Sequence, residues 1–190
     1  MKFLRTFLAL LVLTASALSL ARAADLSGAV MLVATERLAG SSYEEVVLVV
    51  APLAEGGHIG FIVNRPTNVK LEALFPGHEP SRKVLDPVYI GGPVLSDGIF
   101  AIARKAPQGA AQVVPLMPGL VAVLDAASLD RVIETEADDA RYFAGLMVWR
   151  PGELEGEIRE GAWRVRPASV DAVFGKDSGN PSRKPLGPRT

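Results

Sequence analysis

The sequence has 190 residues, of which 20 are basic and 21 acidic, and it contains no cysteine. The missing cysteines exclude a disulfide framework, a thiol nucleophile and any cysteine-ligated metal centre. The near balance of charge argues against the broad basic surface of a nucleic-acid-binding protein.

The first 23 residues have the three-part pattern of a secretory signal peptide. Lys2 and Arg5 precede an apolar run over residues 7–20, and Ala21-Arg22-Ala23 forms a small-x-small cleavage site. The alternative is an uncleaved membrane anchor, but a spanning helix needs about 20 apolar residues and this run is shorter. We therefore expect cleavage before Ala24 and a periplasmic or secreted protein without stable membrane insertion.

Residues 24–174 are predicted to form a single domain. Without the first 23 residues the chain has 167 residues, 17 basic and 21 acidic, and a net charge of −4, and this length is ample for one core. The VVLVVA run at residues 46–51 is typical of a strand buried on both faces. With the following strand it forms a predicted β-hairpin around Glu55-Gly56-Gly57. The strands expected in chain order are 29–34, 46–51, 59–63, 88–90, 99–103, 113–114, 120–124, 142–149 and 163–166.

Four short helices are expected between these strands. Thr67 or Asn68 is predicted to cap a helix that runs through Leu71, Leu74 and Phe75, and Ser128 to cap a helix over residues 129–136. Pro151 suits the first turn of a third helix, which stops at Gly161. A last turn is expected at residues 170–174, a loop at 76–86, and a disordered tail at 175–190.

Three segments in order carry a resemblance to a known family. Residues 59–67 read IGFIVNRPT, residues 89–94 read YIGGPV, and residues 145–163 lead from Gly145 through Pro151-Gly152 to Trp163. In order and spacing they resemble the blocks of the YqgE/AlgH family, and the resemblance covers about residues 30–174. Residues 145–149 are less glycine-rich than the family pattern, and Glu153 stands where glutamine is usual. The signal peptide is a further departure, because related members are mostly cytoplasmic.

The resemblance implies an α+β fold in which a barrel-like, branched β-sheet is surrounded by helices. It implies no particular reaction. Members are often described as transcriptional regulators, but that role is disfavoured for this chain, which is acidic, lacks a helix-turn-helix signature and is expected to be exported.

Two turns are candidates for binding a small anion. In Asn64-Arg65-Pro66, the Arg65 guanidinium could act as a fork for an anion; alternatively Asn64 and Pro66 shape the turn and Arg65 pairs with a structural carboxylate. In Gly91-Gly92-Pro93, the backbone N–H groups of Gly91 and Gly92 could form an anion nest. The alternative is that the glycines permit a tight turn or close packing.

The predicted third helix supplies a second kind of candidate. Glu153 and Glu157, four residues apart, share one helix face and could perform acid–base chemistry or bind a divalent cation. Alternatively they are solvated partners of the positive helix N-terminus. Trp149 and Trp163 bracket this helix and are interpreted as core residues.

The sequence predicts no catalytic residue, metal site or cofactor. His58 lies at the hairpin bend and His78 in a Pro-rich loop, so a zinc site would need carboxylates to complete it. There is no HExxH, GxSxG or P-loop motif.

Two hypotheses of function follow. The first is a non-enzymatic binding or regulatory protein of the cell envelope, with an unknown protein or a small anion as its partner. The second is an enzyme of unrecognised type that acts on a small anionic substrate. Both would use the surface near Arg65, Gly92 and Glu153. The sequence carries no signal of oligomeric state.

Overall fold

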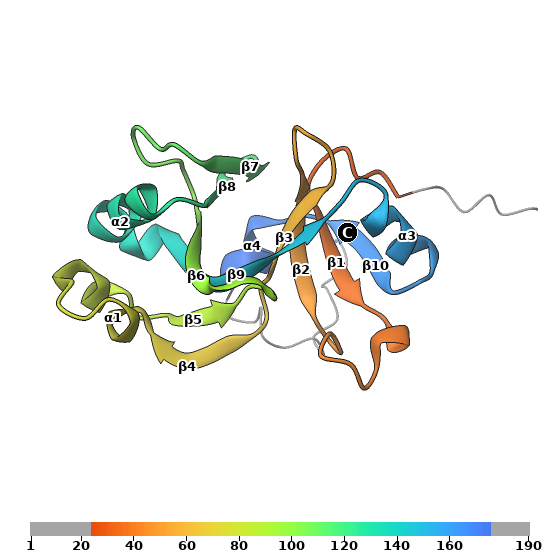
Figure 1. Ribbon diagram of the computed structural model, residues 1–190, viewed down its shortest axis with the longest axis horizontal. Helices are drawn as coiled ribbons and strands as arrows, with labels where there is room; N and C mark the ends of the chain where they lie inside the picture. Colours follow the sequence, from red (N-terminus) through yellow and green to blue (C-terminus); the bar gives the residue numbers. More distant parts are fainter. Residues whose placement is uncertain (1–23, 176–190) are drawn as a thin grey trace, which may run out of the picture.

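The computed structural model describes residues 24–175, so the predicted signal peptide and the tail after Gly175 lie outside it. Ten strands form one curled sheet in the order β10-β1-β2-β3-β9-β6-β8-β7, with β4 and β5 branching from it (Figure 1). Their bounds are β1 Val30–Ala34, β2 Val47–Pro52, β3 His58–Ile62, β4 Pro66–Lys70, β5 Pro87–Ile90, β6 Val94–Ala103, β7 Val113–Met117, β8 Leu120–Val123, β9 Ala140–Trp149 and β10 Trp163–Pro167.

The sheet branches at β9. The end of β9 pairs with β3, where Trp149 lies opposite His58. Further back, Phe143 lies opposite Tyr89 of β5 in a parallel pair and opposite Phe100 of β6 in an antiparallel pair. One long strand therefore joins the two halves of the sheet. The α+β fold with a barrel-like, branched sheet in a single domain is confirmed.

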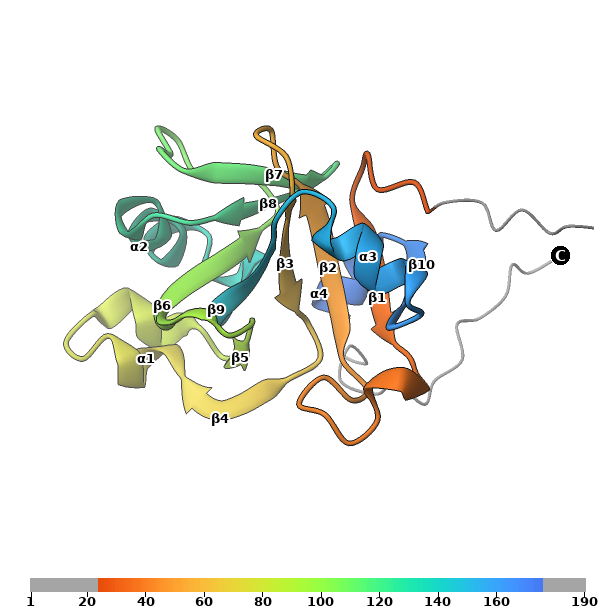
Figure 2. The ribbon, with the colours of Figure 1, turned by 45° about the vertical axis from the view of Figure 1, so that its right-hand side comes forward.

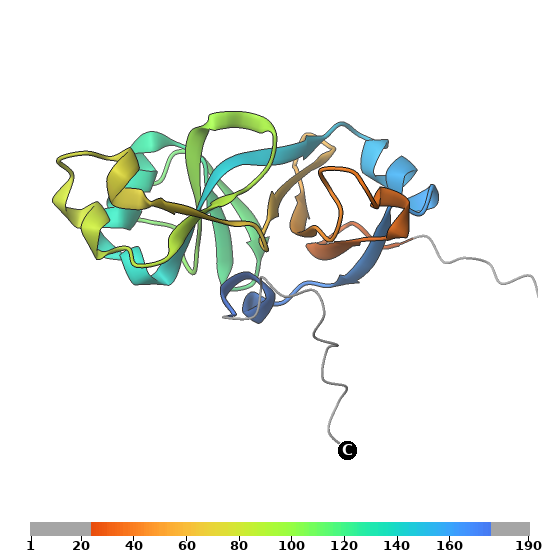
Figure 3. The same cartoon turned by 90° about the horizontal axis from the view of Figure 1, so that it is seen from below.

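The helices are short and lie at the two ends of the sheet and along one side of it (Figure 3). The α-helices are α1 Leu71–Leu74, α2 Ala126–Thr135, α3 Glu153–Arg159 and α4 Val170–Phe174, and the 3-10 helices are η1 Glu36–Leu38, η2 Glu79–Lys83 and η3 Ala137–Asp139. α3 lies beside β10 at the end of the molecule opposite α1 and α2 (Figure 2). α4 lies at one side of the sheet, at the lower edge of Figure 3, and its Val173 is buried in the same cluster as Phe61 and Phe143. Within residues 24–175 no helix has the length and apolar character needed to cross a membrane.

β2 is buried on both faces, as the VVLVVA run predicts, and β3, its partner in the hairpin, is buried as well. Val49 packs in one core cluster, together with Phe61 and Phe143. Leu48 and Val50 point the other way and pack in a second cluster, with Trp149 and Trp163. This alternation follows from the two-residue period of a strand. The hairpin is thus shared by two cores, which fixes its register from both sides.

The predicted starts of the first two helices were wrong. Thr67 and Asn68 do not cap a helix but lie within β4, and the Thr67 hydroxyl donates a hydrogen bond to the Val88 carbonyl of β5 over 2.7 Å. α2 begins at Ala126 because Asp125, an acceptor three residues before Ser128, takes the Ser128 N–H over 2.9 Å. The buried Ser128 hydroxyl instead accepts the Ala111 N–H over 3.3 Å.

Two further predictions needed correction. Pro151 precedes α3 rather than opening its first turn, because the cap is Gly152 with φ 86°. The loop at residues 76–86 contains η2.

Candidate functional site

Asn64 is a buried structural bridge between two strands. Its side-chain oxygen accepts the Val47 N–H over 2.9 Å, and its amide donates to the Glu45 carbonyl over 2.8 Å. Glu45 adopts φ 58°, an uncommon conformation for a residue with a side chain. Asn64 therefore holds the chain where it turns into β2.

Arg65 also makes a structural contact. Its guanidinium donates to the Glu44 carbonyl, and its own carbonyl accepts the Ile90 N–H over 2.9 Å. The guanidinium therefore pairs with a backbone carbonyl rather than with the carboxylate considered above. Anion binding by Asn64 or Arg65 stays a prediction.

Gly91 and Gly92 lie where the chain crosses β9 at very short range. A Cβ atom on Gly91 would lie 2.1 Å from the Gly145 carbonyl oxygen, and one on Gly145 would lie 2.2 Å from the Gly92 carbonyl oxygen. These separations are far below van der Waals contact, so glycine is required on both strands. The Gly91 N–H donates to Ala144 over 2.8 Å, and the Gly91 carbonyl accepts the Ile62 N–H over 2.9 Å. The Gly91 N–H is therefore used within the fold.

The α3 glutamates point to different partners. One Glu153 oxygen accepts the Arg150 N–H over 2.7 Å, just before the helix. One Glu157 oxygen accepts the indole N–H of both tryptophans, over 3.1 Å from Trp149 and 2.6 Å from Trp163. Because Trp149 and Trp163 are both buried, Glu157 provides the acceptor that two buried donors need.

The structure brings some of the candidate residues together but not all. The turn at Asn64 and Arg65 lies against Gly91, since the N–H of Ile62 and the carbonyl of Arg65 bond to residues 91 and 90. α3 lies at the far end of β3, beside Trp149, which pairs with His58. From His58 to Asn64 the extended chain covers about 20 Å. The glutamates and the Asn64 turn therefore do not form one site.

Exposed apolar side chains lie on both sides of the Gly91-Gly92 segment in the sequence and on β9. Ile90 is 49% exposed, Val94 is 38% and Leu95 is 65% exposed, and Val148 on β9 is 45% exposed. Ile90 pairs with Ala144 and Val94 with Leu146, so these two residues lie at neighbouring positions along β9, on its two edges. Figure 3 shows the start of β6 curving away from the body of the molecule.

Leu95 combines this exposure with an unusual backbone. Its φ is 53°, a left-handed conformation that is costly for a leucine and that often marks a functional segment. It lies in the irregular part of β6, where the register with β9 shifts between Val94 and Ile99. We define the exposed apolar segment as Ile90, Val94, Leu95 and Val148. The only sequence signal for it was the apolar Val94-Leu95 pair directly after Gly91-Gly92-Pro93.

Sequence reasoning also missed a buried arginine. Arg141 on β9 is 4% exposed; its guanidinium lies 4.5 Å from the centre of the Tyr89 ring and 3.6 Å from Asp86. It also donates to the Val173 carbonyl of α4. Arg141 therefore links α4 to β9. Its place in the strand pattern gave no hint of this role.

The two histidines have different environments. His58 is buried in β3, opposite Trp149. His78 precedes η2, and its Nε2 lies 3.2 Å from Asp130 Oδ1 on α2. The carboxylates that a histidine metal site would need are thus supplied at His78 by a helix 52 residues further along the chain.

Curated relatives resemble most of the chain. A UPF0301 protein from Chlorobaculum tepidum is 32% identical over 149 residues, which cover 76% of each chain. A UPF0301 protein from Streptomyces coelicolor is 30% identical over 151 residues, which cover 76% of this chain and 78% of that one. The names of these two relatives specify no reaction, ligand or partner.

Two solved structures share the fold. The AlgH protein from Pseudomonas aeruginosa has a TM-score of 0.61 at 24% identity and covers 77% of this chain and 79% of its own. The protein DIP2367 from Corynebacterium diphtheriae has a TM-score of 0.61 at 26% identity and covers 80% of this chain and 81% of its own. The AlgH-like family model matches residues 31–183. The chain therefore belongs to the AlgH-like family.

Proposed function

We propose that this protein is an exported, non-enzymatic interaction protein of the cell envelope. Its partner is another protein, which docks on the exposed apolar segment of Ile90, Val94, Leu95 and Val148. The observation that carries this proposal is Leu95, which is 65% exposed in a left-handed backbone conformation.

The side chains of the segment suit a protein partner better than a small anion. All four are aliphatic and none carries a charge, so burial against another apolar surface is their main source of binding energy. Full burial of one such side chain contributes about 1.5–3 kcal/mol. The closely packed glycine crossing next to these residues reduces the entropy lost on binding, because its strands are already ordered.

The envelope location rests on the N-terminal sequence. Two positive charges, an apolar run and the Ala21-Arg22-Ala23 site form the pattern of a cleaved signal peptide. A transcriptional role, often given to such proteins, does not fit an exported, acidic chain. An exported protein has no access to the chromosome, and net charge −4 after processing opposes contact with phosphates.

Size-exclusion chromatography of gently extracted envelope proteins tests the proposal. Wild-type protein is expected to elute in a complex larger than the purified protein alone, and Leu95→Asp to elute as the free chain. Leu85→Asp is the matched control, because Leu85 is 75% exposed but lies in the loop before β5. Equal elution of all three proteins would contradict the proposal. If the purified protein elutes as a dimer and Leu95→Asp abolishes that dimer, the partner is a second copy of this chain.

A further inference from the structure

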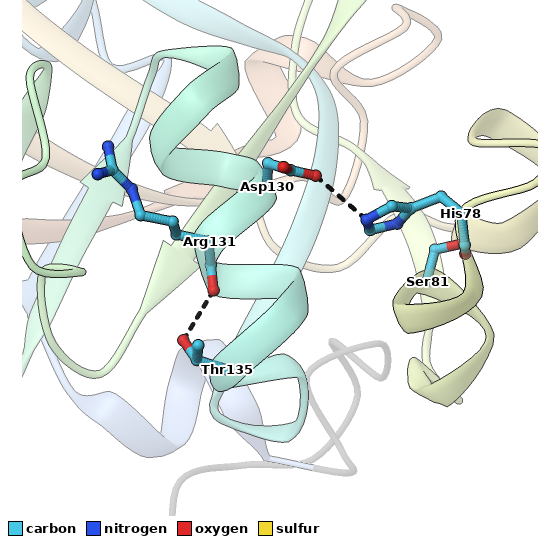
Figure 4. Close-up of polar contacts among 5 residues, drawn as sticks. All are labelled: His78, Ser81, Asp130, Arg131 and Thr135. Atoms are coloured by element: carbon cyan, nitrogen blue, oxygen red, sulfur yellow. Dashed lines mark hydrogen bonds and ion pairs between the residues drawn. The ribbon is translucent and has the colours of Figure 1, made fainter.

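We propose that His78, Asp130 and Glu134 form a binding site for one Zn²⁺ ion. This site goes beyond the proposed function and lies on other elements. His78 comes from the loop before η2, and the two carboxylates come from α2. Figure 4 shows the His78 ring directed at Asp130, with a separation of 3.2 Å between Nε2 and Oδ1.

The spacing of the donor atoms suits zinc. One donor atom from each of the three residues lies within 4.8 Å of the others. Zinc bonds of about 2.0–2.2 Å in a tetrahedron place ligand atoms about 3.3–3.6 Å apart, slightly more than the 3.2 Å between His78 and Asp130. Asp130 and Glu134 are four residues apart in α2 and therefore lie on the same helix face. Glu134 is exposed, so a change of rotamer can bring its carboxylate to the ion.

The His78 ring is held in place, with Nε2 directed at the Asp130 carboxylate. The His78 N–H donates to the Phe75 carbonyl over 3.1 Å, the His78 carbonyl accepts the Ser81 hydroxyl over 2.7 Å, and the ring lies 6.3 Å from the Phe75 ring. Nε2 lies 3.2 Å from Asp130 Oδ1, whereas Nδ1 is sheltered from solvent and has no hydrogen-bond partner within residues 24–175. An imidazole nitrogen that faces carboxylates is also a common metal ligand, so a zinc ion can take the place of the direct contact between Nε2 and Asp130.

Nearby cations are directed elsewhere. Arg131 points to the opposite side of α2 from His78 (Figure 4), where it donates to the Gly109 carbonyl over 3.2 Å. Arg82 pairs with Glu79 over 2.8 Å. The two α2 carboxylates are therefore left facing an imidazole rather than a basic side chain. One imidazole with two carboxylates is a donor set suited to zinc, with a harder character than an all-nitrogen site.

Zinc at this place would link η2 to α2 and retain an open position. Three protein ligands leave one position of a tetrahedral ion for water or for a donor atom of a ligand. A cleft of about 340 Å³ is lined by Phe75, whose ring centre lies 6.3 Å from that of His78, and by Leu129 of α2.

Isothermal titration of the untagged chain of residues 24–190 with ZnCl₂ tests the site. Saturable binding of one ion per chain is expected. Loss of an outer-shell partner already lowers metal affinity by about 10–100-fold, so His78→Gln, Asp130→Asn and Glu134→Gln should each lower it by about tenfold or more. Glu79→Gln is the control, since Glu79 is an exposed η2 carboxylate paired with Arg82, and it should bind zinc as the wild type does.

Thermal unfolding provides a second readout. At a zinc concentration of about 100 times the Kd, the Tm of the wild type should rise by about 5 °C, and EDTA should reverse the rise. Glu134→Gln, an isosteric change at an exposed position, should fold normally but show a much smaller rise. The proposal is overturned if the wild type shows no saturable binding, or if His78→Gln and Glu134→Gln bind zinc as tightly as the wild type.

Discussion

Trp163 donates its indole N–H to Glu157 over 2.6 Å, and this carboxylate oxygen also accepts the indole N–H of Trp149 over 3.1 Å. The glutamate lies on α3 between the two strands that carry the tryptophans. One carboxylate thus joins strand, helix and strand. Its contact with two buried indoles identifies a stabilising role for Glu157.

Glu157→Ala should therefore lower the free energy of unfolding by about 3 kcal/mol, because two indole donors lose their acceptor. Glu157→Gln keeps a neutral acceptor oxygen and should cost about 1 kcal/mol. Urea unfolding followed by tryptophan fluorescence measures both changes. Glu160→Ala is the control, because Glu160 is exposed and lies just after α3. Its free energy of unfolding should stay within about 0.5 kcal/mol of that of the wild type. Equal stability of all four proteins would show that the shared carboxylate is dispensable.

Gly145→Ala tests the crossing of β9 with the Gly91-Gly92 segment. Gly145 has φ 70°, and its added Cβ would lie 2.2 Å from the Gly92 carbonyl oxygen. Backbone strain and displacement of the strand should together lower stability by about 3 kcal/mol or more. Gly28→Ala is the control, because nothing lies within 4 Å of a Cβ added at Gly28. Thermal unfolding of both variants decides the point; a Tm for Gly145→Ala as high as that of the control would refute the close contact.

Asp125 gives α2 a pH-dependent cap. The Ser128 hydroxyl, followed by the backbone N–H groups of Ser128 and Gln112 and the charge of Arg131, holds the pKa of the Asp125 carboxyl below its usual value. A lowered folded-state pKa means that the contribution to stability is present above the unfolded pKa of about 3.9 and is lost as the pH falls through the lower folded value.

Asp125→Ala should accordingly destabilise the protein by about 1 kcal/mol at pH 7 through loss of the cap. The difference from the wild type should shrink below about pH 4, as the wild-type carboxyl becomes protonated. Asp125→Asn keeps an acceptor and should show a smaller difference at pH 7. Urea unfolding at a series of pH values gives these differences. A gap between wild type and Asp125→Ala that widens on acidification would contradict this assignment.

Export predicts a defined N-terminus. The protein recovered from the periplasm or medium should begin at Ala24, because Ala21-Arg22-Ala23 satisfies the small-x-small requirement of signal cleavage. Mass spectrometry of the intact protein measures this end. Ala23→Tyr should block processing and leave the longer chain associated with the membrane. Recovery of the wild type from the cytosol with Met1 to Ala23 intact would overturn the location.

Much of the fold could be predicted from local patterns. The VVLVVA run indicated a strand buried on both faces, and Leu129, Val132 and Ile133 indicated the buried side of α2. The first residues of the helices were harder to predict. Asp125, Thr67 and Ser128 are all residue types that cap helices, and the hydrogen-bond partners near each one in the fold decide which of them does so. Thr67 instead lies in β4, and its hydroxyl donates a hydrogen bond to the Val88 carbonyl of β5.

The candidate sites depended on distances that no local pattern contains. Gly91 and Gly145 are 54 residues apart, and only their shared crossing explains why both must be glycine. The approach of His78 to Asp130 depends likewise on the packing of η2 beside α2. A loop histidine and a helical carboxylate show no common periodicity in the sequence.

Site-specific photo-crosslinking in living cells tests the proposed function most directly. A photoreactive phenylalanine derivative replaces Leu95 in one strain and Leu85 in another, and cells are irradiated before the envelope is isolated. We predict a discrete product of higher mass from position 95, containing the mature chain and one partner protein, and no such product from position 85. No product from position 95, or the same products from both positions, would contradict the account.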